Sequence, residues 1–297
     1  MDDSLTTAEI QLRAVSLYDA VLKEMDRLVA GLASYKWPSE SQLLRARRVA
    51  IGILIIHSLH VSKAIAALLH VKLGNQTLIL VRSQFEMAVK LSYIEKHPQK
   101  GGDFLLSDPF ERYWLAKDYE IATDRFATII SDCKVVVKNN PGLVRYQRAA
   151  KRGRQSADFL AIREGLAFPS MREMILDLGW DLDLYVTVFL FGSLGAHGSI
   201  NQLRQYVEGI DTPSPRFIVN EDQSGVPDYA LQSINYLLGM IGAFAKWFGP
   251  SEELGITVAP LWEEHRFLAG TLFAEEANRV DQKRIRRRKK IEIPPRR

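Results

Sequence analysis

A short polar signature, Arg82-Ser83-x-x-Glu86, lies within the apolar segment LILVRSQFEMAVKLSYI. Arg82 and Glu86 are four residues apart, so on a helix they share one face and can interact. Two interpretations remain open. Either the two residues form a structural ion pair that fixes the register of the helix, or Arg82 presents its guanidinium to a phosphate or carboxylate while Glu86 orients it.

A second signature, Ser193-x-x-x-His197-Gly198-Ser199, lies within the segment FGSLGAHGSI. The segment contains Gly192, Gly195, Ala196 and Gly198, and such small residues allow a neighbouring backbone or a ligand to approach closely. A histidine between two serines can act as an acid or a base near neutral pH. The alternative is a core histidine that hydrogen-bonds Ser193 or a carbonyl group.

Other patterns associated with catalysis are absent from the sequence. There is no phosphate-binding loop, dinucleotide fingerprint, nucleophile elbow or metalloprotease motif. His57 and His60 have no carboxylate or cysteine at ligand spacing, so we expect neither a metal site nor a cofactor. Cys133 is the only cysteine, which excludes an internal disulfide and favours a reducing cytoplasm. His265 follows two glutamates and is expected to be solvated.

Positive charge is concentrated in the last fifteen residues, KRIRRRKKIEIPPRR, which carry a net charge of +8. Because the whole chain has a net charge of +4, the rest of it is mildly acidic, at −4. The segment predicts a flexible tail over residues 281–297 that binds nucleic acid, an acidic membrane or a partner. A merely solubilising end is an equal alternative. The candidate nucleic-acid-binding residues are Lys283, Arg284, Arg286, Arg287, Arg288, Lys289 and Lys290.

Helical periodicity predicts an all-α protein, a multi-helix bundle with one domain over residues 1–280. In the first helix, three- and four-residue spacing predicts a core-facing stripe of Leu12, Val15, Tyr18, Leu22, Met25 and Leu28. The expected helices cover residues 7–35, 39–73, 75–96, 107–137, 169–179, 181–208, 227–248 and 256–280.

Residues that favour helix boundaries separate these segments. A capping box, Ser39-x-x-Gln42, is expected to open the second helix, and Gly74 to end it. Ser170 with Glu173 opens a short helix that Gly179 ends. Residues 211–227 are expected to form a loop or a small hairpin.

The most apolar stretch runs over residues 49–71 and contains His57, His60, Lys63 and His70. A helix in lipid rarely carries so many polar groups, so this stretch predicts the central core helix of a soluble protein. No charged-then-apolar leader pattern is found at the N-terminus. We therefore expect a cytoplasmic protein that does not act at a membrane.

The two signatures, about 110 residues apart, resemble those of an uncharacterised family of bacterial all-helical proteins related to the HEPN superfamily. The resemblance covers about residues 47–206 and implies a HEPN-like core over about 39–208. Many HEPN proteins are metal-independent ribonucleases of toxin–antitoxin or antiviral systems, and many are dimers. Their usual signature, an arginine followed closely by a histidine on one helix, is not found in this sequence.

The resemblance implies a mechanism in which a ribose 2′-hydroxyl attacks the adjacent phosphate. His197 would act as general base or acid, and Arg82 would stabilise charge on the phosphoryl oxygens while Glu86 orients one of these two residues. Ser193 or Ser199 would add a hydrogen bond. RNA is then the expected substrate, and a homodimer and a partner protein or antitoxin are the expected assemblies.

Two further interpretations of the same residues remain. In the first, the protein is a non-enzymatic helical module whose polar residues form a buried network and whose tail binds nucleic acid or a protein partner. In the second, it is a sensor of a small ligand or nucleotide that uses the same polar pocket.

Overall fold

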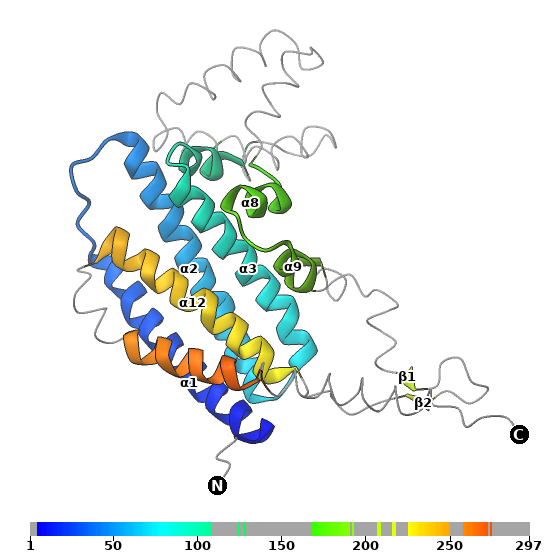
Figure 1. Cartoon of the computed structure of the whole chain (residues 1–297). Coiled ribbons are helices and arrows are strands. Elements are labelled where there is room, and N and C mark those ends of the chain that lie inside the picture. Colours follow the sequence, from blue (N-terminus) through cyan, green and yellow to red (C-terminus); the bar gives the residue numbers. More distant parts are fainter. Residues whose placement is uncertain are drawn as a thin grey trace, which may run out of the picture. The chain divides into compact units, whose positions relative to one another are not determined.

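The computed structural model of the chain is helical over most of the residues that it describes (Figure 1), which confirms the all-α prediction. It describes residues 5–107, 124, 128, 168–190, 192, 207–208, 216–217, 225–249, 258–272 and 274. The elements are α1 (Thr7–Gly31), the 3₁₀-helix η1 (Leu32–Ser34), α2 (Gln42–His70), α3 (Gly74–Lys96), α8 (Met171–Leu178), α9 (Leu182–Leu184), the π-helix η2 (Tyr185–Leu190), β1 (Val207–Glu208), β2 (Arg216–Phe217) and α12 (Val226–Phe248). Residues 100–107 and 258–272 are also helical.

The chain divides into two compact units, each built from separate stretches of sequence. Unit 1 comprises Met1–Leu28, Val61–Val81 and Gly192–Arg297, and unit 2 comprises Val29–His60 and Arg82–Phe191. Boundaries between the units fall within α1, α2 and α3. The expectation of one domain over residues 1–280 stays a prediction.

In unit 1, α1 buries one continuous face whose residues recur at helical spacing. Tyr18, Met25 and Leu28 lie on it as expected, but Leu12 is 74% exposed and Ile10 and Ala14 are buried instead. The hydroxyl of Tyr18 donates to the carbonyl oxygen of Ser62 in α2 and accepts from Ser233 in α12, at 3.2 and 3.1 Å. These bonds satisfy the phenol inside an apolar core.

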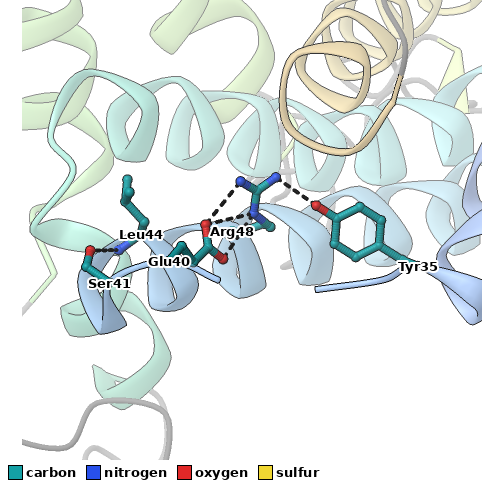
Figure 2. A network of polar contacts seen from close by, with 5 residues as sticks. All are labelled: Tyr35, Glu40, Ser41, Leu44 and Arg48. Atoms are coloured by element: carbon teal, nitrogen blue, oxygen red, sulfur yellow. Dashed lines mark hydrogen bonds and ion pairs between the residues drawn. The ribbon is translucent and has the colours of Figure 1, made fainter. Parts of the chain in front are cut away.

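In unit 2, the start of α2 is held by a polar network (Figure 2). The expected capping box at Ser39 is wrong, because the hydroxyl of Ser41 caps the helix by accepting from the backbone N–H of Leu44 at 3.4 Å. Arg48, in the second turn of α2, pairs with Glu40 at 3.1 Å and donates to the hydroxyl of Tyr35 at 2.9 Å. The network therefore ties the chain before the helix to its first turns.

The turn between α2 and α3 also differs from the prediction. α2 ends at His70, and Lys72, not Gly74, takes the left-handed conformation, with φ at 61°. The N–H groups of Lys72 and Leu73 bond to the carbonyl groups of Leu69 and Leu68, which completes the helix end. Gly74 is then free to be the first residue of α3.

The end of α3 is fastened by Arg47 of α2. Its guanidinium donates to the carbonyl oxygens of Ile94, at 3.1 Å, and of Glu95, which the last turn of a helix otherwise leaves unpaired. Gly101 packs directly against the backbone of Arg47, since a Cβ atom at this position would be only 2.5 Å from the Cα atom of Arg47. The helix over residues 100–107 is therefore seated directly on α2.

α8 forms as the sequence predicts. Ser170 accepts from the N–H of Glu173, the Glu173 carboxylate accepts from the N–H of Ser170, and Gly179 is left-handed with φ at 71°. Asp177 of α8 lies 2.7 Å from the Nε2 atom of His97 and 3.1 Å from the Nζ atom of Lys96, and these partners lower the pKa of its carboxyl group. α8 is thereby attached to the end of α3.

The expected helix over residues 181–208 is only partly correct. Asp181 caps its start, but the chain passes through α9 into the π-helix η2, and residues 207–208 form β1. β1 pairs antiparallel with β2, with Val207 opposite Phe217. The expected hairpin thus exists but begins earlier than residue 211. Of the expected helix over residues 107–137, the described residues 107, 124 and 128 are helical.

α2 is long and apolar enough to cross a bilayer, and among the described helices it alone meets that criterion. Slightly more than half of its most apolar window, 56%, is buried inside the protein. Its outward stripe includes His57, His60, Lys63 and His70. Burial of the opposite face agrees with the expected core helix.

Candidate functional site

Three charged residues form a stripe on α3 within unit 2. Arg82, Glu86 and Lys90 follow one another at intervals of four residues, so all three share one helix face. The Nζ atom of Lys90 donates to the Oε1 atom of Glu86 at 2.7 Å. Both side chains keep nearly a third of their surface exposed, at 27% for Lys90 and 31% for Glu86. The pair is therefore accessible to a ligand.

Arg82 and Glu86 form no ion pair, so the first interpretation of the sequence is not met, and the orientation of Arg82 by Glu86 in the second is not seen either. The guanidinium of Arg82 lies instead over the ring of Phe189, 4.6 Å from its centroid. Its Nε atom is buried and has no hydrogen-bond partner. No carboxylate pairs with Arg82 within the described ranges, so its charge is held by an aromatic face and remains open to an anion.

Phe189 is positioned by the π-helix η2. A π-helix closes its hydrogen bonds one residue further along than an α-helix, and such turns are rare and often occur at functional sites. The rings of Tyr185 and Phe189 stack at 5.2 Å with an interplanar angle of 16°. The Thr187 hydroxyl donates to the carbonyl oxygen of Asp183 at 2.7 Å. The widened turn therefore presents Phe189 to α3.

Beside this stripe, unit 2 contains a cavity of about 520 Å³. Its described lining combines one charged pair with aromatic, aliphatic and thioether side chains. The lining residues are Ile53, Glu86, Lys90, Phe104, Leu105, Ser107, Phe168, Pro169, Met171, Met174 and Phe189. Such a volume and a mostly apolar lining with few polar groups are typical of small-ligand sites.

The walls of the cavity are fixed by the elements described above. Phe104 and Phe168 meet edge to face, with centroids 5.5 Å apart and an interplanar angle of 67°. Met171 and Met174 come from α8, which Asp177 attaches to α3. These contacts hold in place the part of the lining that Phe104, Phe168, Met171 and Met174 form.

The other expected site residues, Ser193, His197 and Ser199, lie outside the described residues, as do Lys283, Arg284, Arg286, Arg287, Arg288, Lys289 and Lys290 of the tail. Within the described ranges, no group of three or more His, Cys, Asp or Glu side chains is arranged to hold a metal ion.

One expectation about the histidines is wrong. His265 is only 8% exposed, and its Nε2 atom lies 3.0 Å from the carbonyl oxygen of Leu231, while Nδ1 is buried without a partner. Burial lowers its pKa from the ordinary value of 6.5. The prediction assumed that His265 shares the exposure of the preceding Glu263 and Glu264. Successive residues of a helix point in different directions, so His265 faces the core although Glu263 is exposed.

A comparison with known families matches residues 48–214, which is more than half of the chain, to a family of unknown function, DUF5677. The chain belongs to this family. No curated protein and no solved structure matches it.

The residues matched to DUF5677 include the whole stripe on α3 and Phe189, and also Ser193, His197 and Ser199. The tail and His265 lie outside the match. The matched residues nearly coincide with those that carry the resemblance seen in the sequence, although the family description says nothing of HEPN proteins.

Sequence reasoning missed Lys90 and Phe189. Lys90 had a usable signal, because it follows Glu86 by the same four residues that separate Glu86 from Arg82. Phe189 had none, because it is more than one hundred residues away from Arg82 in the chain.

Proposed function

We propose that the protein cleaves RNA without a metal ion, as a HEPN-like ribonuclease of a bacterial toxin or antiviral defence system. The site combines Arg82 and Glu86 with His197, and Ser193 and Ser199 contribute hydrogen bonds to the substrate. The protein acts in the cytoplasm as a homodimer, with a partner protein or antitoxin.

In the proposed step, the ribose 2′-oxygen attacks the adjacent phosphorus and loses its proton to a general base. The bond from phosphorus to the 5′-oxygen breaks, and this oxygen takes a proton from a general acid. The products are a 2′,3′-cyclic phosphate and a free 5′-hydroxyl. His197 fills one of the two proton-transfer roles, and Arg82 stabilises the negative charge on the phosphoryl oxygens.

The state of Arg82 is the observation that supports this proposal most. Glu86 is already neutralised by Lys90, so it does not compete with a substrate phosphate for the arginine. The guanidinium is held against Phe189 while its Nε edge lacks a partner. An arginine that is fixed but unpaired suits a phosphate group, to which it donates two parallel hydrogen bonds.

The test is cleavage of total RNA and transfer RNA by the purified protein in EDTA. We expect cleavage, its loss in His197→Ala, and a strong reduction in Arg82→Gln. His57→Ala and Arg27→Gln are matched controls, because both residues are exposed and neither is among the residues that line the cavity. Equal cleavage by His197→Ala would exclude the proposed mechanism.

A second candidate is a non-enzymatic module that binds nucleic acid or protein. The ion pair between Glu86 and Lys90 favours it, because a carboxylate already paired with an ammonium group is less available as a catalytic base and suits recognition by hydrogen bonds. Absence of cleavage by the folded protein, with retained RNA binding, would favour this candidate.

A further inference from the structure

The cavity of unit 2 presents a polar edge inside apolar walls. Glu86 and Lys90 supply a carboxylate and an ammonium group 2.7 Å apart, and Ser107 adds a hydroxyl. The remaining described lining is apolar, and it includes Phe104, Phe168 and Phe189. A flat aromatic group that is polar along one edge matches this combination of aromatic walls and a polar edge.

The charged pair also limits the net charge of the part of the ligand that enters the cavity. Because the two charges cancel, the cavity favours a neutral group with hydrogen-bond donors next to an acceptor. An unstacked nucleobase has this form, since proteins bind such bases between aromatic side chains and read their edges by hydrogen bonds.

We propose that this cavity binds the guanine base of a guanine nucleotide. Guanine presents two neighbouring donors, its N1–H and N2–H groups, beside the acceptor O6. The two oxygens of the Glu86 carboxylate accept from the donors, and the Lys90 ammonium, which has three donors, reaches O6.

The other three bases match this edge less well. Adenine places an acceptor at N1, and cytosine one at N3, where the carboxylate needs a donor. Uracil offers a single donor between two acceptors. Each mismatch sets two acceptors or two donors against each other at the partly exposed pair of Glu86 and Lys90, and this loss of hydrogen bonds disfavours the other bases.

Arg82 completes the proposed site. It lies one turn before Glu86 on α3 and packs on Phe189, which is also a wall of the cavity. It thereby supplies a cation beside the cavity for the phosphate of the same nucleotide. The choice of single-stranded RNA as the source of the guanine rests on the proposed function, whereas binding of a free guanine nucleotide does not.

Calorimetric titration of the full-length chain with the 5′-monophosphates of guanosine, inosine, adenosine, cytidine and uridine tests the inference. We expect guanosine monophosphate to bind most tightly. Inosine monophosphate, which lacks the N2 amino group, should bind about tenfold more weakly. Equal affinities for all five, or no binding of guanosine monophosphate, would overturn the proposal without any variant.

A variant then tests the assigned carboxylate. Glu86→Gln should reduce binding of guanosine monophosphate at least about tenfold and remove its advantage over adenosine monophosphate. Glu24→Gln is the matched control, because Glu24 forms a similar local pair with Arg27 on α1. Selectivity that survives in Glu86→Gln would refute the role of this carboxylate.

Two short single-stranded RNAs that differ by one guanosine or adenosine separate the two sources of the base. Preference for the guanosine strand indicates RNA, whereas selectivity confined to the mononucleotide indicates a free nucleotide. Selective nucleotide binding without RNA cleavage would support the guanine site and contradict the proposed ribonuclease activity. RNA cleavage that depends on His197 but shows no base selectivity would support the ribonuclease activity and contradict the guanine site.

Discussion

Glu86 accepts its hydrogen bond from Lys90, one turn further along α3, and not from Arg82, one turn before it. The two cations are equally distant from Glu86 in sequence, yet they have different roles. Lys90 neutralises the carboxylate at the edge of a cavity, and Arg82 is held by the ring of Phe189.

Replacing Arg82 should cost little stability. Arg82→Met removes a cation–π contact, worth about 1 kcal/mol, and leaves no buried carboxylate alone. Breaking a buried ion pair would cost roughly 3–5 kcal/mol. Urea unfolding at neutral pH distinguishes the two costs, with Arg45→Met, at an exposed position of α2, as control. A loss of the larger size would mean that Arg82 has a buried anionic partner.

Gly101→Ala should destabilise the fold by about 1–3 kcal/mol, because its new Cβ atom would meet the backbone of Arg47. The same substitution at Gly239, exposed in α12 with open space around it, should stabilise the fold by up to about 1 kcal/mol. Thermal unfolding of both variants provides the comparison. Equal effects of the two substitutions would contradict the close packing of the helix over residues 100–107 on α2.

Stability should fall with acidification because of His265. Its folded-state pKa is lowered by burial, so below the ordinary value of 6.5 the unfolded chain binds more protons than the folded one. The contribution of the neutral imidazole is complete above that value and is lost as the pH falls toward the folded-state pKa. Urea unfolding between about pH 7 and about pH 5 should show this slope.

His265→Gln tests whether His265 causes this dependence of the unfolding free energy on pH. Glutamine keeps an N–H donor for the carbonyl oxygen of Leu231 but does not titrate, so the slope should be smaller. His57→Gln, at an exposed position, should leave it unchanged. An identical slope in His265→Gln and the unmodified protein would assign the pH dependence to other groups.

Deleting residues 283–297 tests the expected role of the tail in binding nucleic acid. If its lysines and arginines contact phosphates, the slope of log affinity against log salt concentration should fall by about 0.7 for each lost contact with single-stranded RNA. A chain of the same length, with the seven basic residues 283–290 replaced by glutamine, separates charge from length. An unchanged slope in both variants would exclude the tail as the contact.

Helix boundaries could be predicted from the sequence where the residues that form the cap are close together in the chain. Ser170, Glu173 and Gly179 act through backbone groups of the same short helix, so α8 was predicted correctly. The sequence did not distinguish Ser39 from Ser41 as the N-terminal cap of α2. Two nearby serines offer the same chemistry, and the network of Glu40, Arg48 and Tyr35 forms only in the folded chain.

The sequence by itself determined the all-α class, the boundaries of α3, α8 and α12 to within two residues, and the face of α3 that carries Arg82 and Glu86. These features follow from hydrogen bonds and side-chain spacing within a few residues. Only the tertiary structure decided that Glu86 pairs with Lys90, that Arg82 packs on Phe189, and that a cavity lies beside them. These contacts depend on helices that are distant in sequence, where packing selects one partner among several that local spacing allows.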